Sequence, residues 1–197
     1  PIWITVHPKE GTPAGVHRVD VHIKPANALE TVLLLEVQVW DFALPKESHL
    51  KTAFALFDHE LAAWYGGYTP EIRRAYYQFL LDHRINPTNI YSGRPVPSMD
   101  DLPFCTERGL NAFSLAYTHN KDEKGREELK AMLKEHETFL REKGWWGKAY
   151  IYGFDEILPE KYGELRDMYG WLKTQFLDLP RMCTVIPNED LRGYVDI

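Results

Sequence analysis

The sequence predicts an α/β fold, and three observations support this prediction. Short apolar runs alternate with segments whose apolar side chains recur at helical spacing, which is typical of parallel strands joined by helices. The chain up to Pro45 carries strand patterns only, so the sequence divides into two unlike parts. Hydrophobic residues make up 44% of the 197 residues, which is enough for a buried core.

The first part is expected to form β-strands. Val19, Val21 and Ile23 alternate with polar residues, which is the pattern of a half-buried strand. We expect strands at residues 2–6, 16–24 and 32–40. Three strands seldom form a stable unit alone, so this part is expected to lean on another layer.

The second part is expected to alternate strands with helices. The strands expected from their apolar runs are residues 50–57, 89–92, 111–117, 150–154, 181–186 and 194–197. The first of these is ambiguous, because residues 51–64 also fit a helix. The alternation predicts a parallel sheet with helical crossovers.

Three helices are predicted between these strands. Thr69 supplies a capping hydroxyl and Pro70 takes the first helical position, so one helix begins there. Residues 121–143 form a second helix, which has an apolar stripe and ends at Gly144. Residues 160–177 form the third, again with apolar side chains on one face.

Two adjacent carboxylates, Asp155 and Glu156, follow the apolar run at 150–154. That run is rich in strong strand formers, so the pair lies where a strand ends and a loop begins. Barrel enzymes keep their chemistry at this end of their strands, and paired carboxylates there suggest acid catalysis on a sugar. The structural alternative is that acidic residues often precede a helix.

Composition argues against several classes of protein. The net charge of −6 and the lack of a Lys/Arg cluster argue against a nucleic-acid binder. No apolar run approaches the roughly 18 residues needed to cross a membrane. Cys105 and Cys183 fit no metal or redox spacing, although a disulfide between them stays open. His7, His17 and His22 give no convincing metal set, so neither a metal nor a cofactor is expected.

Several segments together resemble a known enzyme family. They are residues 13–17 (PAGVH), 37–45 (VQVWDFALP), 50–54 (LKTAF), 150–156 (YIYGFDE), 182–184 (MCT) and 193–197 (GYVDI). In order and spacing they resemble glycoside hydrolase family 123 and its uncharacterised relatives. That family contains β-N-acetylgalactosaminidases, and the resemblance covers nearly the whole chain.

The resemblance implies a β-sandwich followed by a (β/α)8 TIM barrel. Residues 1–45 would be the last strands of the sandwich, and residues 46–197 the first part of the barrel. About six barrel strands fit into this length, and the run at 150–154 would be the fourth. The resemblance assigns Glu156 as the general acid/base and Asp155 as the residue that steers the 2-acetamido group of the substrate. It also implies an extracellular, periplasmic or lysosomal protein.

Substrate-assisted catalysis explains why two neighbouring carboxylates suffice. An ordinary retaining glycosidase places a carboxylate nucleophile about 5–5.5 Å from its acid, whereas here the sugar's own acetamido oxygen attacks the anomeric carbon. Glu156 would protonate the leaving group and then activate water, while Asp155 would stabilise the oxazolinium-like intermediate. The expected partner is a carbohydrate with β-linked N-acetylhexosamine, and the resemblance favours N-acetylgalactosamine.

Further candidates for contact with the sugar are His119, Asn120, Tyr91, Tyr152 and Asp196. The first two follow the third expected strand of the second part, and Tyr91 belongs to the second. Each has a structural alternative. A loop histidine is usually solvated, Tyr152 suits packing, and Asp196 suits a structural hydrogen bond.

An incomplete barrel would expose a sheet edge and apolar strand faces, so we expect further chain segments or another chain to complete it. Two other functions stay open. One is a glycosidase for another sugar with a separate nucleophile, and the other is a non-catalytic carbohydrate-binding or structural fragment. Dependence on the 2-acetamido group separates the first from the leading hypothesis, and binding without turnover would favour the second.

Overall fold

The computed structural model describes residues 2–197, which form two compact units. The first unit ends at Pro45, and the second spans Lys46–Ile197. No helix within the described residues is long and apolar enough to cross a membrane.

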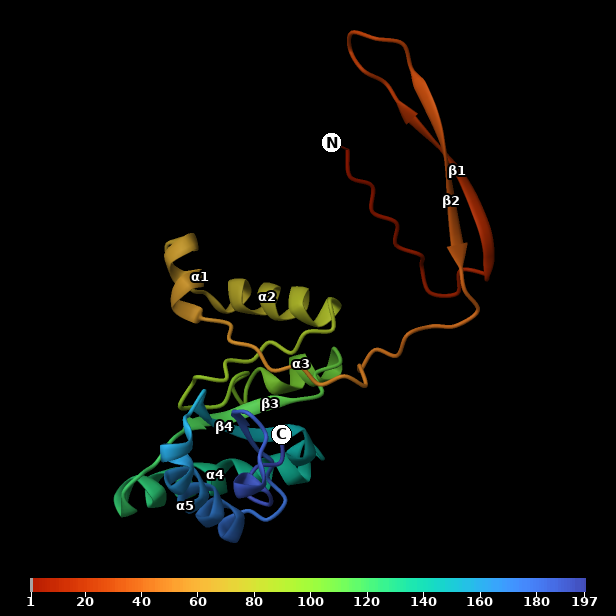
Figure 1. Ribbon diagram of the computed structural model, residues 1–197. Coiled ribbons are helices and arrows are strands. Elements are labelled where there is room, and N and C mark those ends of the chain that lie inside the picture. The colour runs from red at the N-terminus through yellow and green to blue at the C-terminus, as the bar shows by residue number, and fades with distance from the viewer. Residues whose placement is uncertain (1) are drawn as a thin grey trace. The chain divides into compact units, whose positions relative to one another are not determined.

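The first unit contains an antiparallel hairpin of β1 (Gly15–Ile23) and β2 (Thr31–Val39), which Figure 1 shows as two long strands. Val19 lies opposite Leu35, which gives the hairpin an apolar face. The opposite face is mixed, because Leu34 and Val32 lie there opposite Asp20 and His22, and it also carries an ion pair. That pair joins Arg18 to Glu36 at 3.0 Å.

The predicted end of a β-sandwich is wrong. Residues 2–6 form no strand, and none of the described residues up to Pro45 is buried. A sandwich needs a second sheet packed on the first. The described part of this unit contains the hairpin alone, so its apolar face has no second layer within the unit.

The second unit is built on a parallel sheet with the strand order β3-β4-β5. Its strands are β3 (Phe113–Thr118), β4 (Ala149–Asp155) and β5 (Arg181–Thr184). Helix α4 (Glu123–Glu142) joins the first pair of strands and α5 (Tyr162–Gln175) the second. This is the predicted alternation of parallel strands and helical crossovers, on the smaller scale of three strands.

Three more helices precede the sheet in the sequence. They are α1 (Asp58–Tyr65), α2 (Pro70–Asp82) and α3 (Leu102–Glu107), and single 3-10 turns lie at Trp146–Lys148, Pro159–Lys161 and Glu189–Leu191. The predicted cap of α2 is confirmed, because the Thr69 hydroxyl accepts a hydrogen bond from the backbone of Ile72 at 3.3 Å. Helix α3 was not expected, since it begins within a proline-rich stretch.

The predicted (β/α)8 TIM barrel is wrong. The described residues contain five strands in two small sheets, one antiparallel pair and one parallel sheet of three. The runs at 50–57 and 89–92 meet only in an isolated bridge between Ala55 and Asn89. The run at 194–197 takes part in one further isolated bridge and forms no strand.

Side-chain hydrogen bonds bind backbone groups beside the bridge between Ala55 and Asn89. The Thr88 hydroxyl accepts from the N–H of Phe54 at 3.2 Å and donates to its C=O at 2.9 Å, and this C=O also accepts from the backbone N–H of Ile90 at 3.2 Å. The Asn86 amide donates in the same way to Thr52 at 3.0 Å. Pro87 between them has no N–H to contribute to a ladder.

The main core lies between the sheet and the two crossover helices. Figure 1 shows α4 and α5 together on one side of the sheet. Their buried side chains, such as Leu133 and Leu165, join Phe113 and Ile151 of the strands in one apolar cluster. A smaller cluster that includes Tyr152 covers the other face.

The strands β3 and β4 approach each other closely at Gly153. A methyl group at this position would lie 1.7 Å from the carbonyl oxygen of Thr118. The two residues are also paired in the parallel ladder. No side chain larger than hydrogen fits between the strands here, so the glycine sets their spacing at the carboxyl end of the sheet.

We therefore expect Gly153→Ala to lower the free energy of unfolding by about 3 kcal/mol or more, because the added methyl overlaps a backbone atom. Urea denaturation followed by circular dichroism measures the change. Gly163→Ala is the matched control. Gly163 lies exposed in α5 with no atom within 4 Å of the added methyl, so that variant should gain up to about 1 kcal/mol. Equal stability of the two variants would contradict the close approach.

Candidate functional site

The parallel sheet brings the carboxyl ends of its strands to one edge, where ligands usually bind in open α/β sheets. Asp155 is the last residue of β4, and it lies opposite Thr184, the last residue of β5. The Glu156 backbone N–H donates to the Thr184 carbonyl at 2.8 Å. The two carboxylates singled out in the sequence therefore lie at this edge, on the central strand.

A β-bulge displaces the chain just before the pair. Between Tyr152 and Asp155, β4 advances by one residue more than the facing segment of β5. Phe154 and Glu156, on either side of Asp155, have left-handed φ angles of 54° and 48°. Such angles cost on the order of 1–3 kcal/mol for residues other than glycine, and they are concentrated at functional sites.

The surrounding core holds this backbone in place. Phe154 is buried and its ring packs edge-on against Tyr169 at a centroid distance of 5.2 Å. The Tyr169 hydroxyl donates to the carbonyl of Met182 in β5 at 2.7 Å. The bulge is thus tied to both the core and the neighbouring strand.

Three hydroxyl groups surround the Asp155 carboxylate. The hydroxyls of Tyr152 and Thr184 donate to Oδ1, and the Tyr91 hydroxyl donates to Oδ2 at 3.1 Å. Hydrogen bonds from Thr184, then Tyr152 and then Tyr91 lower the pKa of Asp155, although partial burial opposes them. Asp155 is therefore ionised and oriented at neutral pH.

The Glu156 side chain has a different environment. It is exposed, and within residues 2–197 its carboxylate has neither a hydrogen-bond donor nor an ion-pair partner. The hydrogen bond to Asp155 and then burial raise the pKa of the Tyr91 hydroxyl, and the charge of Glu156 adds to this rise. The pair thus consists of one carboxylate held by hydroxyls and one that is open to a ligand.

A cluster of aromatic rings lies beside Asp155. The Tyr91 ring has centroid distances of 5.8 Å to both Tyr117 and Tyr152. The Tyr91 ring is also nearly parallel to that of Phe57, with a centroid distance of 6.3 Å and an interplanar angle of 9°. Tyr91 and Phe57 are partly exposed, so the cluster presents an aromatic surface to solvent.

The structure brings together only some of the residues proposed from the sequence. Tyr91 and Tyr152 contact Asp155 directly. His119 lies at the margin, with its ring 6.0 Å from Tyr117, and Asn120 is exposed in the loop after β3.

Asp196 lies elsewhere. It accepts hydrogen bonds from the backbone and guanidinium of Arg181, at 2.9 and 2.6 Å. Arg181 begins β5, whereas the candidate site lies at the end of that strand. Asp196 therefore makes structural hydrogen bonds, which was the alternative to contact with the sugar.

Sequence reasoning missed Thr184, Tyr117 and Phe57 as members of the site. Tyr117 ends the predicted strand at 111–117, so its position was a usable signal, whereas the strand predicted at 181–186 was too long to place Thr184 at its end. Phe57 precedes α1, and nothing in the sequence indicates that it reaches Tyr91.

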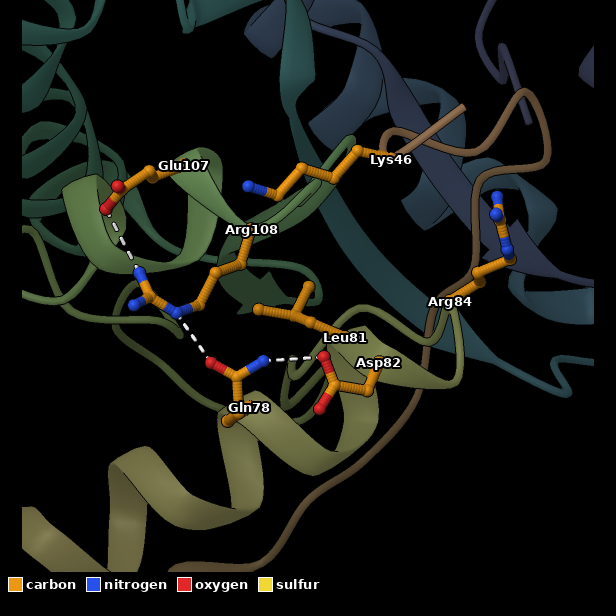
Figure 2. A pocket seen from close by; sticks show the side chains of 7 residues that line it. All are labelled: Lys46, Gln78, Leu81, Asp82, Arg84, Glu107 and Arg108. Atoms are coloured by element: carbon orange, nitrogen blue, oxygen red, sulfur yellow. Dashed lines mark hydrogen bonds and ion pairs between the residues drawn. The ribbon is translucent and has the colours of Figure 1, made fainter. Parts of the chain in front are cut away.

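A polar pocket of about 360 Å³ lies at another part of the second unit, and Figure 2 shows its lining side chains. Arg108 donates to Gln78 and Glu107, and Gln78 donates to Asp82. These side chains therefore serve as hydrogen-bond partners for one another. Arg108 also precedes β3, so it lies toward the amino ends of the strands, away from Asp155.

Comparison with known proteins gives no family assignment, because no family model matches the chain and no curated protein sequence matches it either. Within residues 2–197, no three His, Cys, Asp or Glu side chains are grouped so that they could hold a metal ion. Cys105 and Cys183 are free thiols.

Thr184→Val removes the largest cause of the lowered pKa, so we expect the pKa of Asp155 to rise towards the ordinary 3.8. An NMR titration of the Asp155 side-chain carboxyl measures this. The folded pKa lies below the unfolded one, so ionised Asp155 stabilises the fold above about pH 4, and this stability is lost as pH falls through the folded pKa. The difference in the free energy of unfolding between the wild type and Thr184→Val should therefore become smaller at acidic pH.

The matched control is Thr174→Val, because the Thr174 hydroxyl bonds within α5 and not to Asp155. It should leave the Asp155 titration unchanged. An unchanged titration in Thr184→Val would show that this hydroxyl does not hold the carboxylate.

Proposed function

We propose that this protein is a glycoside hydrolase that removes β-linked N-acetylhexosamine by a retaining, substrate-assisted mechanism. The observation that carries the proposal is the unequal pair of neighbouring carboxylates at the end of β4. Asp155 is ionised and held by three hydroxyls, whereas Glu156 is exposed and unpaired among the described residues. Substrate-assisted hydrolysis requires two carboxylates with such different tasks.

Asp155 suits the task of holding the acetamido group. Its Oδ1 accepts from two hydroxyls, but its Oδ2 accepts from Tyr91 alone, which leaves a lone pair for an amide N–H. Its negative charge would stabilise the positive charge that develops on the oxazolinium-like intermediate. The hydroxyls keep the carboxylate in place, so little reorganisation is needed during the reaction.

Glu156 suits the task of acid and base. In the first step the acetamido oxygen bonds to the anomeric carbon, the glycosidic bond breaks, and the Glu156 proton passes to the leaving oxygen. In the second step Glu156 takes a proton from water, whose oxygen bonds to the anomeric carbon and reopens the ring of the intermediate. The lack of a competing partner for this side chain supports the role.

The sugar itself would rest on the aromatic cluster. Tyr91 bonds to Asp155, and Phe57 lies parallel to Tyr91; both are partly exposed, and exposed aromatic rings can stack against the apolar face of a sugar ring. The family resemblance favours N-acetylgalactosamine as the sugar. The same rings support a second candidate function, carbohydrate binding without hydrolysis, because stacking needs no acid.

Glu156→Gln should lower kcat for an aryl 2-acetamido-2-deoxy-β-galactoside by about 10²–10⁴-fold, because the amide cannot transfer a proton. Release of the aryl group measures the rate. Glu160→Gln is the matched control, since Glu160 is exposed in the following turn and should not affect the rate. Full activity in Glu156→Gln would rule out its role as the acid, and binding of the sugar without turnover by the wild type would favour the second candidate.

Asp155→Asn tests the assisted route, because it removes the charge that stabilises the intermediate. We expect the variant to lose about 10²-fold or more in kcat on the acetamido substrate. The wild type should hardly hydrolyse the matching glycoside with a 2-hydroxyl, since that sugar lacks the attacking oxygen. A covalent adduct between the sugar and a carboxylate, detected by mass spectrometry, would instead indicate a separate nucleophile.

A further inference from the structure

An apolar groove of about 320 Å³ lies between α1 and α2. Its lining consists of Ala55, Leu56, Phe57, Glu60, Leu61, Trp64, Tyr76, Phe79 and Leu80. Trp64 and Phe79 are 69% and 59% exposed, so two large apolar side chains border the groove without being covered by the unit itself. Patches of this kind often mark binding sites.

The groove shares Phe57 with the aromatic cluster beside Asp155. Phe57 lines the groove, and its ring also lies parallel to that of Tyr91. The Tyr91 hydroxyl in turn bonds to Asp155. A sugar ring beside Asp155 and an apolar group in the groove would therefore both contact the aromatic cluster that contains Tyr91 and Phe57.

The chemistry of the lining selects the kind of group that fits. Glu60 provides the only charged side chain among the lining residues, and the Tyr76 hydroxyl already pairs with Tyr65 at 3.0 Å. A second sugar would need several hydrogen-bond partners to replace its water, and the lining offers few. Alkyl or aryl groups need none and gain free energy from leaving water.

We propose that this groove binds an apolar aglycone, the alkyl or aryl group attached to the sugar that the Asp155 site binds. The inference rests on the proposed function for the identity of the sugar, and on the groove for the identity of the aglycone. The substrates of this protein would then be glycosides of an apolar alcohol.

Binding of two non-hydrolysable ligands tests the proposal directly. Methyl and hexyl 2-acetamido-2-deoxy-1-thio-β-galactosides share the sugar and differ only in the apolar chain. Calorimetry on the full chain should give a dissociation constant that is about tenfold lower, or lower still, for the hexyl ligand, because several methylene groups leave water. The two ligands binding equally would overturn the proposal.

Two substitutions locate the effect in the groove. Trp64→Ala and Phe79→Ser both alter exposed positions, so the fold should persist, and each should reduce the preference for the hexyl ligand several-fold. Leu177→Ala is the matched control. Leu177 is 77% exposed and lies after α5, before β5 begins, so the preference should remain. A preference that persists in both groove variants would also overturn the proposal.

Hydrolysis provides a separate readout for the proposed function. The substrates for this readout are the methyl and hexyl 2-acetamido-2-deoxy-β-galactosides, which have oxygen in place of sulfur. If the hexyl thioglycoside binds preferentially but neither of these oxygen glycosides is hydrolysed, the groove proposal is supported and the hydrolase proposal fails. If both oxygen glycosides are hydrolysed with equal kcat/KM, and the two thioglycosides bind equally, the hydrolase proposal is supported and the groove proposal fails.

Discussion

The position of Asp155 depends on the way in which β4 is held between its two neighbours. On one side, Gly153 lets the strand approach the Thr118 carbonyl more closely than any side chain would permit. On the other side, Thr184 pairs with the end of the strand through backbone and side chain. The bulge before Asp155 places one extra residue in β4 between these two contacts. The Asp155 carboxylate therefore has a defined position at the edge of the sheet.

Thr184 shows how closely the candidate site and the sheet are linked. Its carbonyl accepts from the Glu156 backbone, and its hydroxyl donates to the Asp155 carboxylate. The same residue thus ends a ladder and lowers the pKa of the neighbouring carboxyl group. A site at rigid strand ends is held more precisely than one on free loops, because the residues that support its side chains belong to the sheet.

The sequence was informative wherever a local signal determined the structure. Capping by Thr69 and the apolar stripe of residues 121–143 predicted α2 and α4 because helix ends and helix faces follow from nearby residues. The number of strands was overestimated, because a run such as 89–92 has the composition of a strand. Its pairing with residues 50–57 is a single bridge, and the side chains of Thr88 and Asn86 bond to the backbone of residues 50–57 beside that bridge.

The candidate site was predictable to a similar extent. The end of β4 and its two acids followed from strand propensity, and Tyr91 and Tyr152 were named with them. The hydroxyl of Thr184 and the ring of Phe57 were not found, because both reach the site only through tertiary packing. The place of Asp196 was ambiguous for the same reason, since pairing with Arg181 depends on a contact 15 residues apart in the chain.

The left-handed backbone at Glu156 has a consequence for engineering. Glycine adopts this conformation without a steric penalty, so a search for thermostable variants would favour glycine at this position. Glu156→Gly would be more stable to heat and would lack the exposed carboxylate. Under the proposed function, selection for heat resistance would favour glycine at this position, whereas selection for turnover would keep glutamate.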